Sequence, residues 1–253
     1  MRANGRRLAE VAAALRQAVV PGATTRALDR MAFEHIRRLG ARPSFLGYAP
    51  GGAPPFPASI CASVNAAVVH GVPDDRPLEQ GDVLSLDMGL FYGGFHADMA
   101  FTVIVGGGGD ARKKGLLDVA EESLYRATAL AVSGNRVGDL GFAIESFISP
   151  HKLGIVRQFV GHGIGRALHE RPSVPNFGKR NTGDRLRVGM CLAIEPMVTL
   201  GTWKTRILED GWTAVTLDGE CAAHFEHTIA VTPSGPEVLT TLDDSISVSD
   251  TIR

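Results

Sequence analysis

The sequence predicts an α+β fold made of two similar halves, each a pair of helices followed by antiparallel strands. Residues 19–36 and 131–148 align at an offset of 112 with four identical residues. Four identities in eighteen positions could arise by chance, but each segment has the pattern helix, glycine turn, helix, and each is followed by strands. No low-complexity linker separates the halves, so we assign residues 1–253 to a single domain with pseudo-twofold symmetry.

Composition and charge limit the class of protein. Apolar residues make up 44% of the chain, charged residues 21%, and the formal charge is −1. This balance argues against non-specific nucleic-acid binding, which needs a basic surface. The cysteines at 61, 191 and 221 are too few for a disulfide framework and lack the spacing of a zinc cluster, so we expect a reduced, cytoplasmic protein. Residues 44–73 carry no Asp, Glu, Lys or Arg, but their prolines exclude a membrane-spanning helix.

Two helices are predicted at the start of the chain. The first covers residues 4–20, because its apolar residues recur every three or four positions and form one stripe: Leu8, Val11, Ala12, Leu15 and Val19. The second covers about 24–40 and begins at a capping threonine. The arginine-rich start could also belong to an export or transit signal. However, Glu10 and Arg16 interrupt the apolar segment that such a signal needs, which favours a helix of the mature protein.

The later elements follow from hydrophobic periodicity and turn residues. In chain order they are an apolar loop at 44–58, a strand at 60–69, a strand at 83–89, a turn at 92–94, a return strand at 95–105, helices at 113–132 and 139–148, and strands with glycine-rich turns from 155. The polar tail after residue 242 is expected to be frayed.

Two aspartates fall within the predicted hairpin, in an otherwise apolar setting. If the turn is centred between residues 92 and 93, Asp87 and Asp98 are directly opposed. If it is centred on 93–94, Asp87 lies opposite Ala100 and the aspartates are diagonal neighbours. In both registers two carboxylates converge on one face, where they repel each other unless a cation lies between them. Two separately solvated aspartates are equally compatible with this segment.

Three more segments place polar side chains in apolar or glycine-rich surroundings. His162 and His169 lie in GHGIGRALHE, Glu195 ends an apolar strand, and strand alternation puts His224 and Glu226 on one face. A loop histidine is more often structural than functional. A carboxylate inside an apolar strand is costly unless it is paired or metal-bound. Four such carboxylates with one imidazole favour Mn, Fe(II), Co or Zn in a two-metal hydrolytic site.

The motifs SVNAAVVHGVPDD, LDMG…FHAD, GHGIGRALHE, AIEPM and FEHT closely resemble, in this order, a type I methionine aminopeptidase of the pita-bread fold. The resemblance extends from residue 1 to about 240. It implies two αα-plus-antiparallel-sheet halves around a central curved sheet, and a centre of two divalent metal ions. The implied ligands are Asp87, Asp98, His162, Glu195 and Glu226. In this pattern Asp98 and Glu226 bridge the ions, His162 and Glu195 complete one site, and Asp87 completes the other.

The resemblance also implies roles in substrate binding and catalysis. Glu195 matches the general base, His169 the residue that hydrogen-bonds the substrate carbonyl or amide, and His70 the residue that contacts the substrate backbone near the scissile amide. Five residues match an apolar pocket for the methionine side chain, although each taken alone is more readily explained as a core residue: Tyr48, Phe56, Cys61, Leu168 and Trp212. The implied activity is removal of the initiator methionine from nascent proteins near the ribosome, by a cytoplasmic monomer that binds no membrane and no specific nucleic-acid sequence.

Several features depart from the family pattern. The loop at 47–59 is about five residues longer than usual, Leu168 stands where the family often has Phe, and His224 stands where it usually has Gln. The chain starts within the first helix, without the usual leader or a zinc-finger-like extension, as expected for the short bacterial form. Two alternatives remain open at this stage: another pita-bread peptidase of the Xaa-Pro type, and a non-catalytic paralogue that acts by binding.

Overall fold

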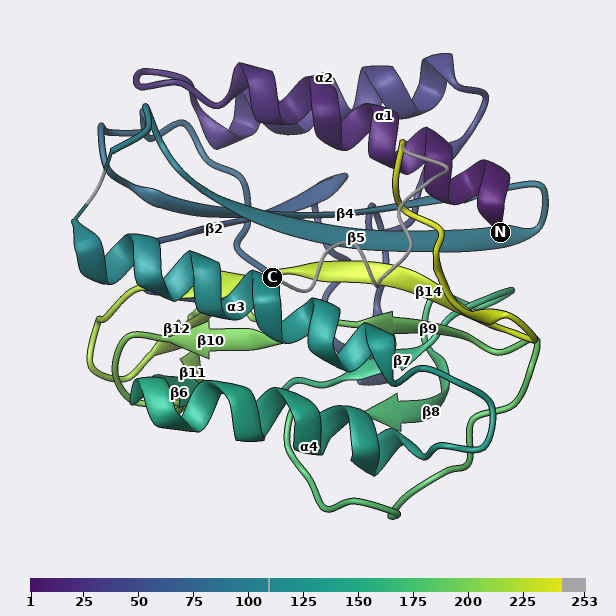
Figure 1. Ribbon diagram of the computed structural model, residues 1–253. Coiled ribbons are helices and arrows are strands. Elements are labelled where there is room, and N and C mark those ends of the chain that lie inside the picture. Colours follow the sequence, from purple (N-terminus) through teal and green to yellow (C-terminus); the bar gives the residue numbers. More distant parts are fainter. Residues whose placement is uncertain (109, 243–253) are drawn as a thin grey trace.

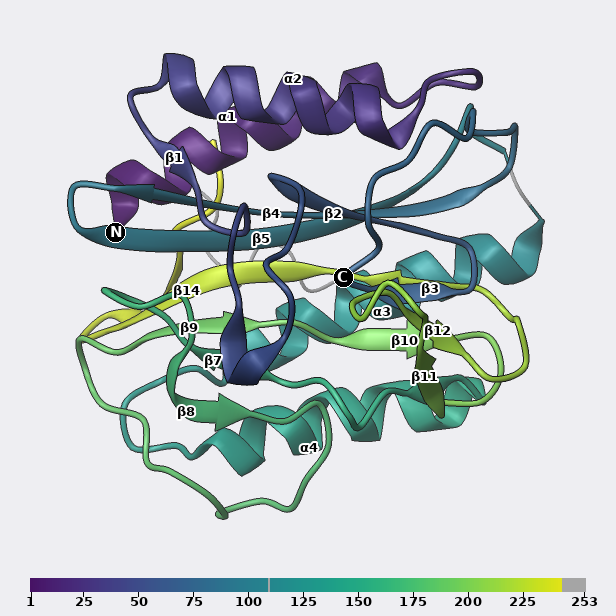
Figure 2. The same ribbon diagram turned by 180° about the vertical axis from the view of Figure 1, so that it is seen from behind.

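The computed structural model describes residues 1–108 and 110–242, and two pairs of helices flank a curved antiparallel sheet (Figures 1 and 2). One pair is α1 (Arg2–Ala18) and α2 (Thr25–Arg38); the other is α3 (Ala111–Ala129) and α4 (Val137–Ile148). Each pair precedes strands in the chain, so the predicted α+β class and its repeated order of elements are confirmed. Each helix lies within three residues of its predicted bounds.

The main sheet has nine strands within the described residues, and all its pairings are antiparallel. Its spatial order is β1-β4-β5-β14-β9-β7-β8, with β2 also paired to β4 and β15 to β14. The strands are β1 (Arg42–Pro43), β2 (Ile60–Val64), β4 (Val83–Tyr92), β5 (Phe95–Ile104), β7 (Gly161–Gly163), β8 (Glu170–Val174), β9 (Cys191–Ile194), β14 (Glu226–Thr232) and β15 (Gly235–Val238).

Two three-stranded sheets and two short 3₁₀ turns complete the described elements. One sheet has the order β13 (Ala222–His224), β10 (Met197–Thr199), β6 (Gly154–Ile155). The other has the order β11 (Thr205–Ile207), β12 (Ala214–Thr216), β3 (Ala67–Val69). The 3₁₀ turns cover Pro50–Gly52 and Ser149–His151. No described helix combines the length and hydropathy that a membrane span requires.

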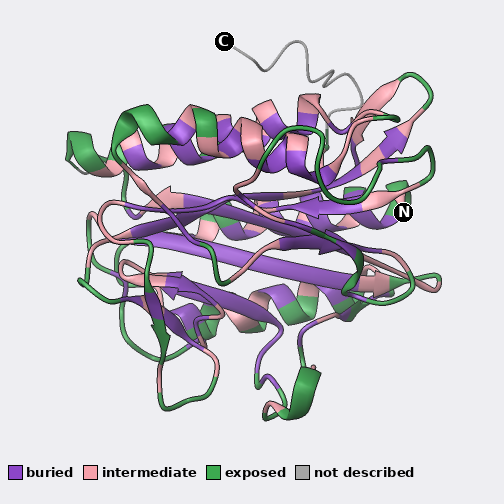
Figure 3. Ribbon diagram, turned by 90° about the horizontal axis from the view of Figure 1, so that it is seen from below, coloured by how far each residue is buried: buried purple, intermediate pink, exposed green. Residues whose placement is uncertain are grey.

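The helices form where capping and packing both favour them. The Thr24 hydroxyl accepts the Ala27 amide at 3.1 Å and caps α2, as the sequence predicted. The Asp110 carboxylate caps α3 in the same way, by accepting the Lys113 amide at 2.8 Å. The apolar stripe of α1 packs into the core against β4 and β5. Figure 3 shows the buried residues concentrated on the strands and on the inward faces of the helices.

The structure corrects one strand prediction and decides between the two registers predicted for the hairpin. The predicted strand at 60–69 is two strands, β2 and β3, because Asn65 adopts a φ of 53° and starts a turn between them. In the β4–β5 hairpin Asp87 pairs with Ala100 and Asp98 with Gly89, so the glycine pair 93–94 forms the turn and the two aspartates are diagonal neighbours. The direct opposition was wrong. The tail predicted to be frayed, residues 243–253, lies outside the described residues.

Candidate metal centre

Five polar side chains converge from five strands that are adjacent in the main sheet. Taken across the sheet from β4 to β5, β14, β9 and β7, each strand or its end contributes one residue: Asp87, Asp98, Glu226, Glu195 and His162. Glu195 directly follows β9, and the other four lie within their strands. Residues up to 139 positions apart in the chain therefore share one site, because the sheet order differs from the chain order.

His162 is oriented toward the carboxylates. Its Nδ1 donates a hydrogen bond to the Gly163 carbonyl at 2.9 Å, and a carbonyl can only accept, so the free lone pair is on Nε2. This Nε2 lies 3.5 Å from Glu195 Oε1 and 4.0 Å from Asp98 Oδ2. One ligand atom from each of Asp98, His162 and Glu226 lies within 4.8 Å of the other two. These distances leave room for a cation between the donors.

The four carboxylates are poorly compensated by the protein itself. Asp87 Oδ1, Asp98 Oδ1 and Glu226 Oε1 are buried and have no hydrogen-bond partner. Burial raises the pKa of Asp87 to about 7. Burial and the neighbouring carboxylates raise the pKa of Asp98, Glu195 and Glu226 well above the usual value. Buried polar atoms in proteins are normally hydrogen-bonded or metal-bound, so this oxygen-rich set with one imidazole fits divalent metal.

A cavity of about 370 Å³ opens onto these ligands. All five residues predicted for the apolar pocket line it: Tyr48, Phe56, Cys61, Leu168 and Trp212. Phe56 and Trp212 meet edge to face with ring centroids 5.2 Å apart, which gives the pocket a rigid aromatic wall. Phe45 and Pro50 also line the cavity and were not predicted. Both lie in the uncharged 44–73 segment, which is the only sequence signal for them.

The two predicted non-ligand histidines also lie on this cavity. His70 has a left-handed φ of 59°, and its ring meets the edges of Phe159 and Trp212 at centroid distances of 5.3 and 6.1 Å. Burial lowers the pKa of His70 to about 4, so the ring is neutral near pH 7. The ring of His169 lies between those of His162 and Tyr48, with centroids 4.2 and 5.3 Å away.

Two further polar residues lie beside the ligand residues. His224 Nε2 is buried without a hydrogen-bond partner, 3.7 Å from Glu195 Oε2 and 3.9 Å from Glu226 Oε2. The shared face predicted for residues 224 and 226 therefore agrees with the structure, although they belong to different strands, β13 and β14. The side-chain amide of Asn176 donates to the Glu195 carbonyl at 3.0 Å. Nothing in the sequence indicated this contact, which joins residues 19 positions apart.

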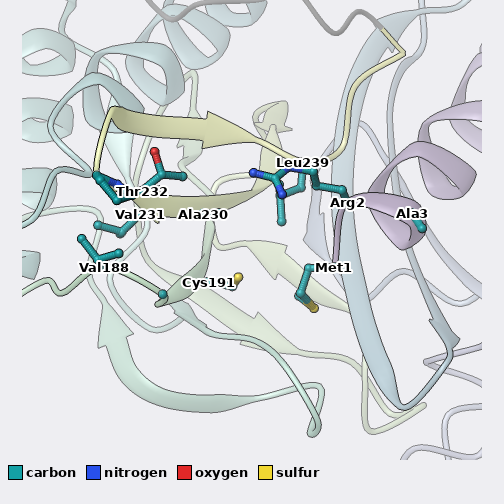
Figure 4. Close-up of a pocket in the computed structure, with 11 residues that line it drawn as sticks. Met1, Arg2, Ala3, Val188, Cys191, Ala230, Val231, Thr232 and Leu239 are labelled. Carbon is teal, nitrogen blue, oxygen red and sulfur yellow. The ribbon is translucent and has the colours of Figure 1, made fainter.

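A larger hollow of about 520 Å³ lies elsewhere on the surface, between the start of α1 and the ends of β9 and β14 (Figure 4). Met1, Val188 and Cys191 are among the residues that line it, and most of its lining is apolar. None of the five converging ligands reaches it. Binding sites combine an apolar cavity with a few convergent polar groups, so the smaller cavity is the candidate functional site.

Comparison with known proteins gives the family of the chain. Residues 1–233 match the model of metallopeptidase family M24. A methionine aminopeptidase of Clostridium perfringens is 45% identical over 240 residues, which cover 95% of this chain and 94% of that protein. The crystal structure of a methionine aminopeptidase from Thermotoga maritima matches with a TM-score of 0.91 and 42% identity, covering 95% of each chain. A prolidase from Pyrococcus furiosus has a TM-score of 0.75, 19% identity and coverage of 96% and 63% of the two chains, a likeness of fold alone.

Proposed function

The chain belongs to metallopeptidase family M24, and from this premise we propose that it is a hydrolase that removes the N-terminal methionine from polypeptides. One observation carries the proposal. A single cavity of about 370 Å³ holds both an apolar pocket for a side chain and a set of carboxylates and imidazole suited to divalent metal. The relatives named as methionine aminopeptidases match nearly the whole chain, and their activity is the one this cavity suits.

We infer that the centre holds two divalent ions, drawn from Co, Mn, Fe(II) and Zn. The residues that would hold them are Asp87, Asp98, His162, Glu195 and Glu226. The unpartnered carboxylate oxygens and the lone pair of His162 Nε2 support this assignment. Ions held there would polarise the substrate carbonyl and make an attacking water molecule more acidic.

The chain's own residues then supply the proton transfers and the orientation. The Glu195 carboxylate accepts a proton from the attacking water and delivers it to the leaving amine. His169 Nε2 donates a hydrogen bond to the carbonyl oxygen as negative charge develops on it, and His70 contacts the substrate backbone beside the scissile amide. The neutral state of His70 near pH 7 suits such a contact.

The apolar part of the cavity would bind the methionine side chain. Cys61, Leu168 and Phe56 are each no more than 4% exposed, so the pocket wall is packed from behind. Trp212 closes it at one edge. Leu168 is not aromatic, and a branched aliphatic wall is less rigid than a ring, so we expect the pocket to accept side chains close to methionine in size.

We further propose that the protein acts in the cytoplasm as a monomer on nascent N-termini near the ribosome, without binding a membrane or a specific nucleic-acid sequence. Its reduced cysteines and near-neutral charge support this setting. The likeness to prolidase concerns the fold, and no feature of this chain favours an Xaa-Pro substrate. A non-catalytic binding role is disfavoured because all five ligand positions keep a ligating side chain.

The test is release of methionine from Met-Ala-Ser and Met-Gly-Met-Met, compared with leucine- and proline-containing analogues, with Mn, Fe(II), Co or Zn supplied in turn. We expect rapid release from the methionyl peptides alone. Preference for a peptide with proline in the second position would indicate the Xaa-Pro activity instead. Protein that purifies without two metal equivalents and shows no turnover on any peptide would indicate a binding paralogue.

A further inference from the structure

Tyr48 forms a direct contact with His169 across 121 residues of sequence. Its hydroxyl oxygen lies 2.7 Å from His169 Nδ1, and the two rings stack with centroids 5.3 Å apart and planes at 27°. The distance is that of a strong hydrogen bond. Stacking and hydrogen bonding together fix both the position and the rotation of the imidazole.

The backbone holds Tyr48 firmly on its side of this contact. Its amide donates to the Phe45 carbonyl, and its carbonyl accepts the Phe56 amide, both at 2.8 Å. The Gly47 amide donates to the Phe56 carbonyl, also at 2.8 Å, so residues 47–48 and 56 form the closed neck of the long loop. The residues between Tyr48 and Phe56 lie beyond this neck.

On its own side His169 contacts the His162 ring, with centroids 4.2 Å apart, but among the described residues this side offers its imidazole no hydrogen bond. It lies in the connection between β7 and β8 and is exposed, so packing alone does not fix the rotation of its ring. Among the described residues, the Tyr48 hydroxyl is the hydrogen-bond partner of this imidazole. The orientation of His169 therefore depends on Tyr48.

The chemistry of the two groups decides which one donates. A phenol O–H is a good donor, and the lone pair of a neutral imidazole is a better acceptor than a phenol oxygen. Partial burial raises the pKa of Tyr48, so its hydroxyl keeps the proton near neutral pH. With Nδ1 as acceptor, the single proton of the neutral His169 ring must be on Nε2. His162 has the opposite tautomer, since its Nδ1 donates to the Gly163 carbonyl.

We propose that Tyr48 is a positioning residue whose hydroxyl donates to His169 Nδ1 and so holds the ring proton on Nε2, aimed at the substrate carbonyl. The role of the Nε2 proton rests on the proposed function. The tautomer itself does not, because it follows from the contact between the two side chains.

The first test is spectroscopic and needs no turnover. Long-range ¹H–¹⁵N spectra of protein labelled at histidine nitrogen, loaded with diamagnetic zinc, report which ring nitrogen carries the proton. His169 is assigned from the signals that His169→Gln removes. We expect Nδ1 of His169 to be unprotonated in the wild type, and its signal to shift in Tyr48→Phe, which keeps the stacking ring. Tyr92→Phe is the matched control, because the Tyr92 ring stacks on the Arg7 guanidinium and not on His169.

The second test separates positioning from binding. Tyr48→Phe should lower kcat on the order of 10-fold and leave KM within about 2-fold. A donor to the developing oxyanion raises kcat by ~10²–10³, and a misoriented donor loses part of this effect. A proton on Nδ1 in the wild type, or unchanged His169 signals and kcat in Tyr48→Phe, would overturn the proposal. A wild type that shows the expected tautomer but releases no methionine would contradict the proposed function and support the contact described here.

Discussion

His162 and His169 lie seven residues apart in one glycine-rich segment, and their rings face each other at 4.2 Å with planes tilted by 47°. Only His162 reaches the carboxylates, at 3.5 Å from Glu195 and 4.0 Å from Asp98. His169 instead takes its partner from Tyr48, on the other side of the cavity. One short segment thus supplies a group that suits a cation and a group that suits a substrate.

Replacing the general base should remove most of the activity and leave the fold intact. Glu195→Gln keeps the size of the side chain but removes the proton acceptor. Loss of a general base costs ~10²–10⁴ in rate, so we expect kcat to fall at least 100-fold in metal-saturated protein. Circular dichroism checks the fold, and calorimetric titration with metal checks occupancy. Turnover equal to wild type at full occupancy would show that another residue is the base.

Removing the metal should make stability fall as pH rises. The buried carboxyls have raised pKa values in the folded protein, Asp87 at about 7, whereas in the unfolded chain they ionise near pH 4. Between these values the unfolded state binds fewer protons, so the stabilisation present at low pH is lost as pH rises toward 7 and above. In excess chelator we expect a higher Tm at pH 7 than at pH 9. This range lies above the ionisation of the buried histidines, whose lowered pKa values in the folded protein would oppose the trend at pH 5.

Metal should reverse this trend, because its ligands bind in their deprotonated forms. Asp87→Asn supplies the matched control, since it removes one of the titrating groups and should flatten the pH dependence of the chelated protein. Activity should vanish with chelator and return with divalent ion. If the chelated wild type and Asp87→Asn showed the same dependence of Tm on pH, the buried carboxyls would not be the groups responsible.

Much of this site could be predicted from the sequence for two reasons. Some of its residues lie close together in the chain, and others are carboxylates whose burial in an apolar strand is energetically unfavourable without a partner. The glycine pair limited the β4–β5 hairpin to two registers, so Asp87 and Asp98 had to approach each other in either case. Burying a carboxylate in an apolar strand costs enough free energy to mark Glu195 and Glu226 as candidates without an alignment. The fold class followed from the order of helices and strands.

Other features depended on contacts that the sequence does not encode locally. The apolar run 60–69 has no Gly or Pro, so the turn at Asn65 was not visible, although asparagine tolerates the left-handed backbone there. The Tyr48–His169 contact and the Asn176 hydrogen bond to Glu195 join loops whose approach only the tertiary packing determines. Pro50 lines the cavity because of how the long loop folds back.

His224 should tune the metal centre. Its Nε2 is buried, lacks a partner and faces Glu195 and Glu226. Side chains that contact metal ligands typically alter affinity or activity ~10–100-fold. We therefore expect His224→Gln, which restores the residue usual in the resembled family, to change metal affinity about 10-fold by calorimetry. His151→Gln, at an exposed position, is the control. Equal affinities and equal pH–rate profiles in His224→Gln and wild type would make His224 a structural substitute.

The long loop should restrict the residue that follows methionine. Beyond its neck the loop carries Pro50 to the cavity lining. It also rests against the turn that holds Trp212, since a Cβ on Gly211 would lie only 3.4 Å from Pro54 Cγ. We therefore expect the loop to lie close to the second residue of a bound peptide.

Deleting residues 50–54 should therefore relax this restriction and leave the methionine pocket in place. A steric restriction of this kind lowers kcat/KM for the larger substrate roughly 10-fold or more relative to the smaller one. We expect the ratio of kcat/KM for Met-Leu-Ser to that for Met-Ala-Ser to rise about 10-fold in the deletion variant. Pro50→Gly, which keeps the loop length, should produce a smaller rise. The His169 ring-nitrogen signals of the variant verify that Tyr48 still holds its contact. A ratio within about 2-fold of wild type, with those signals unchanged, would show that the loop plays no part in selecting the second residue.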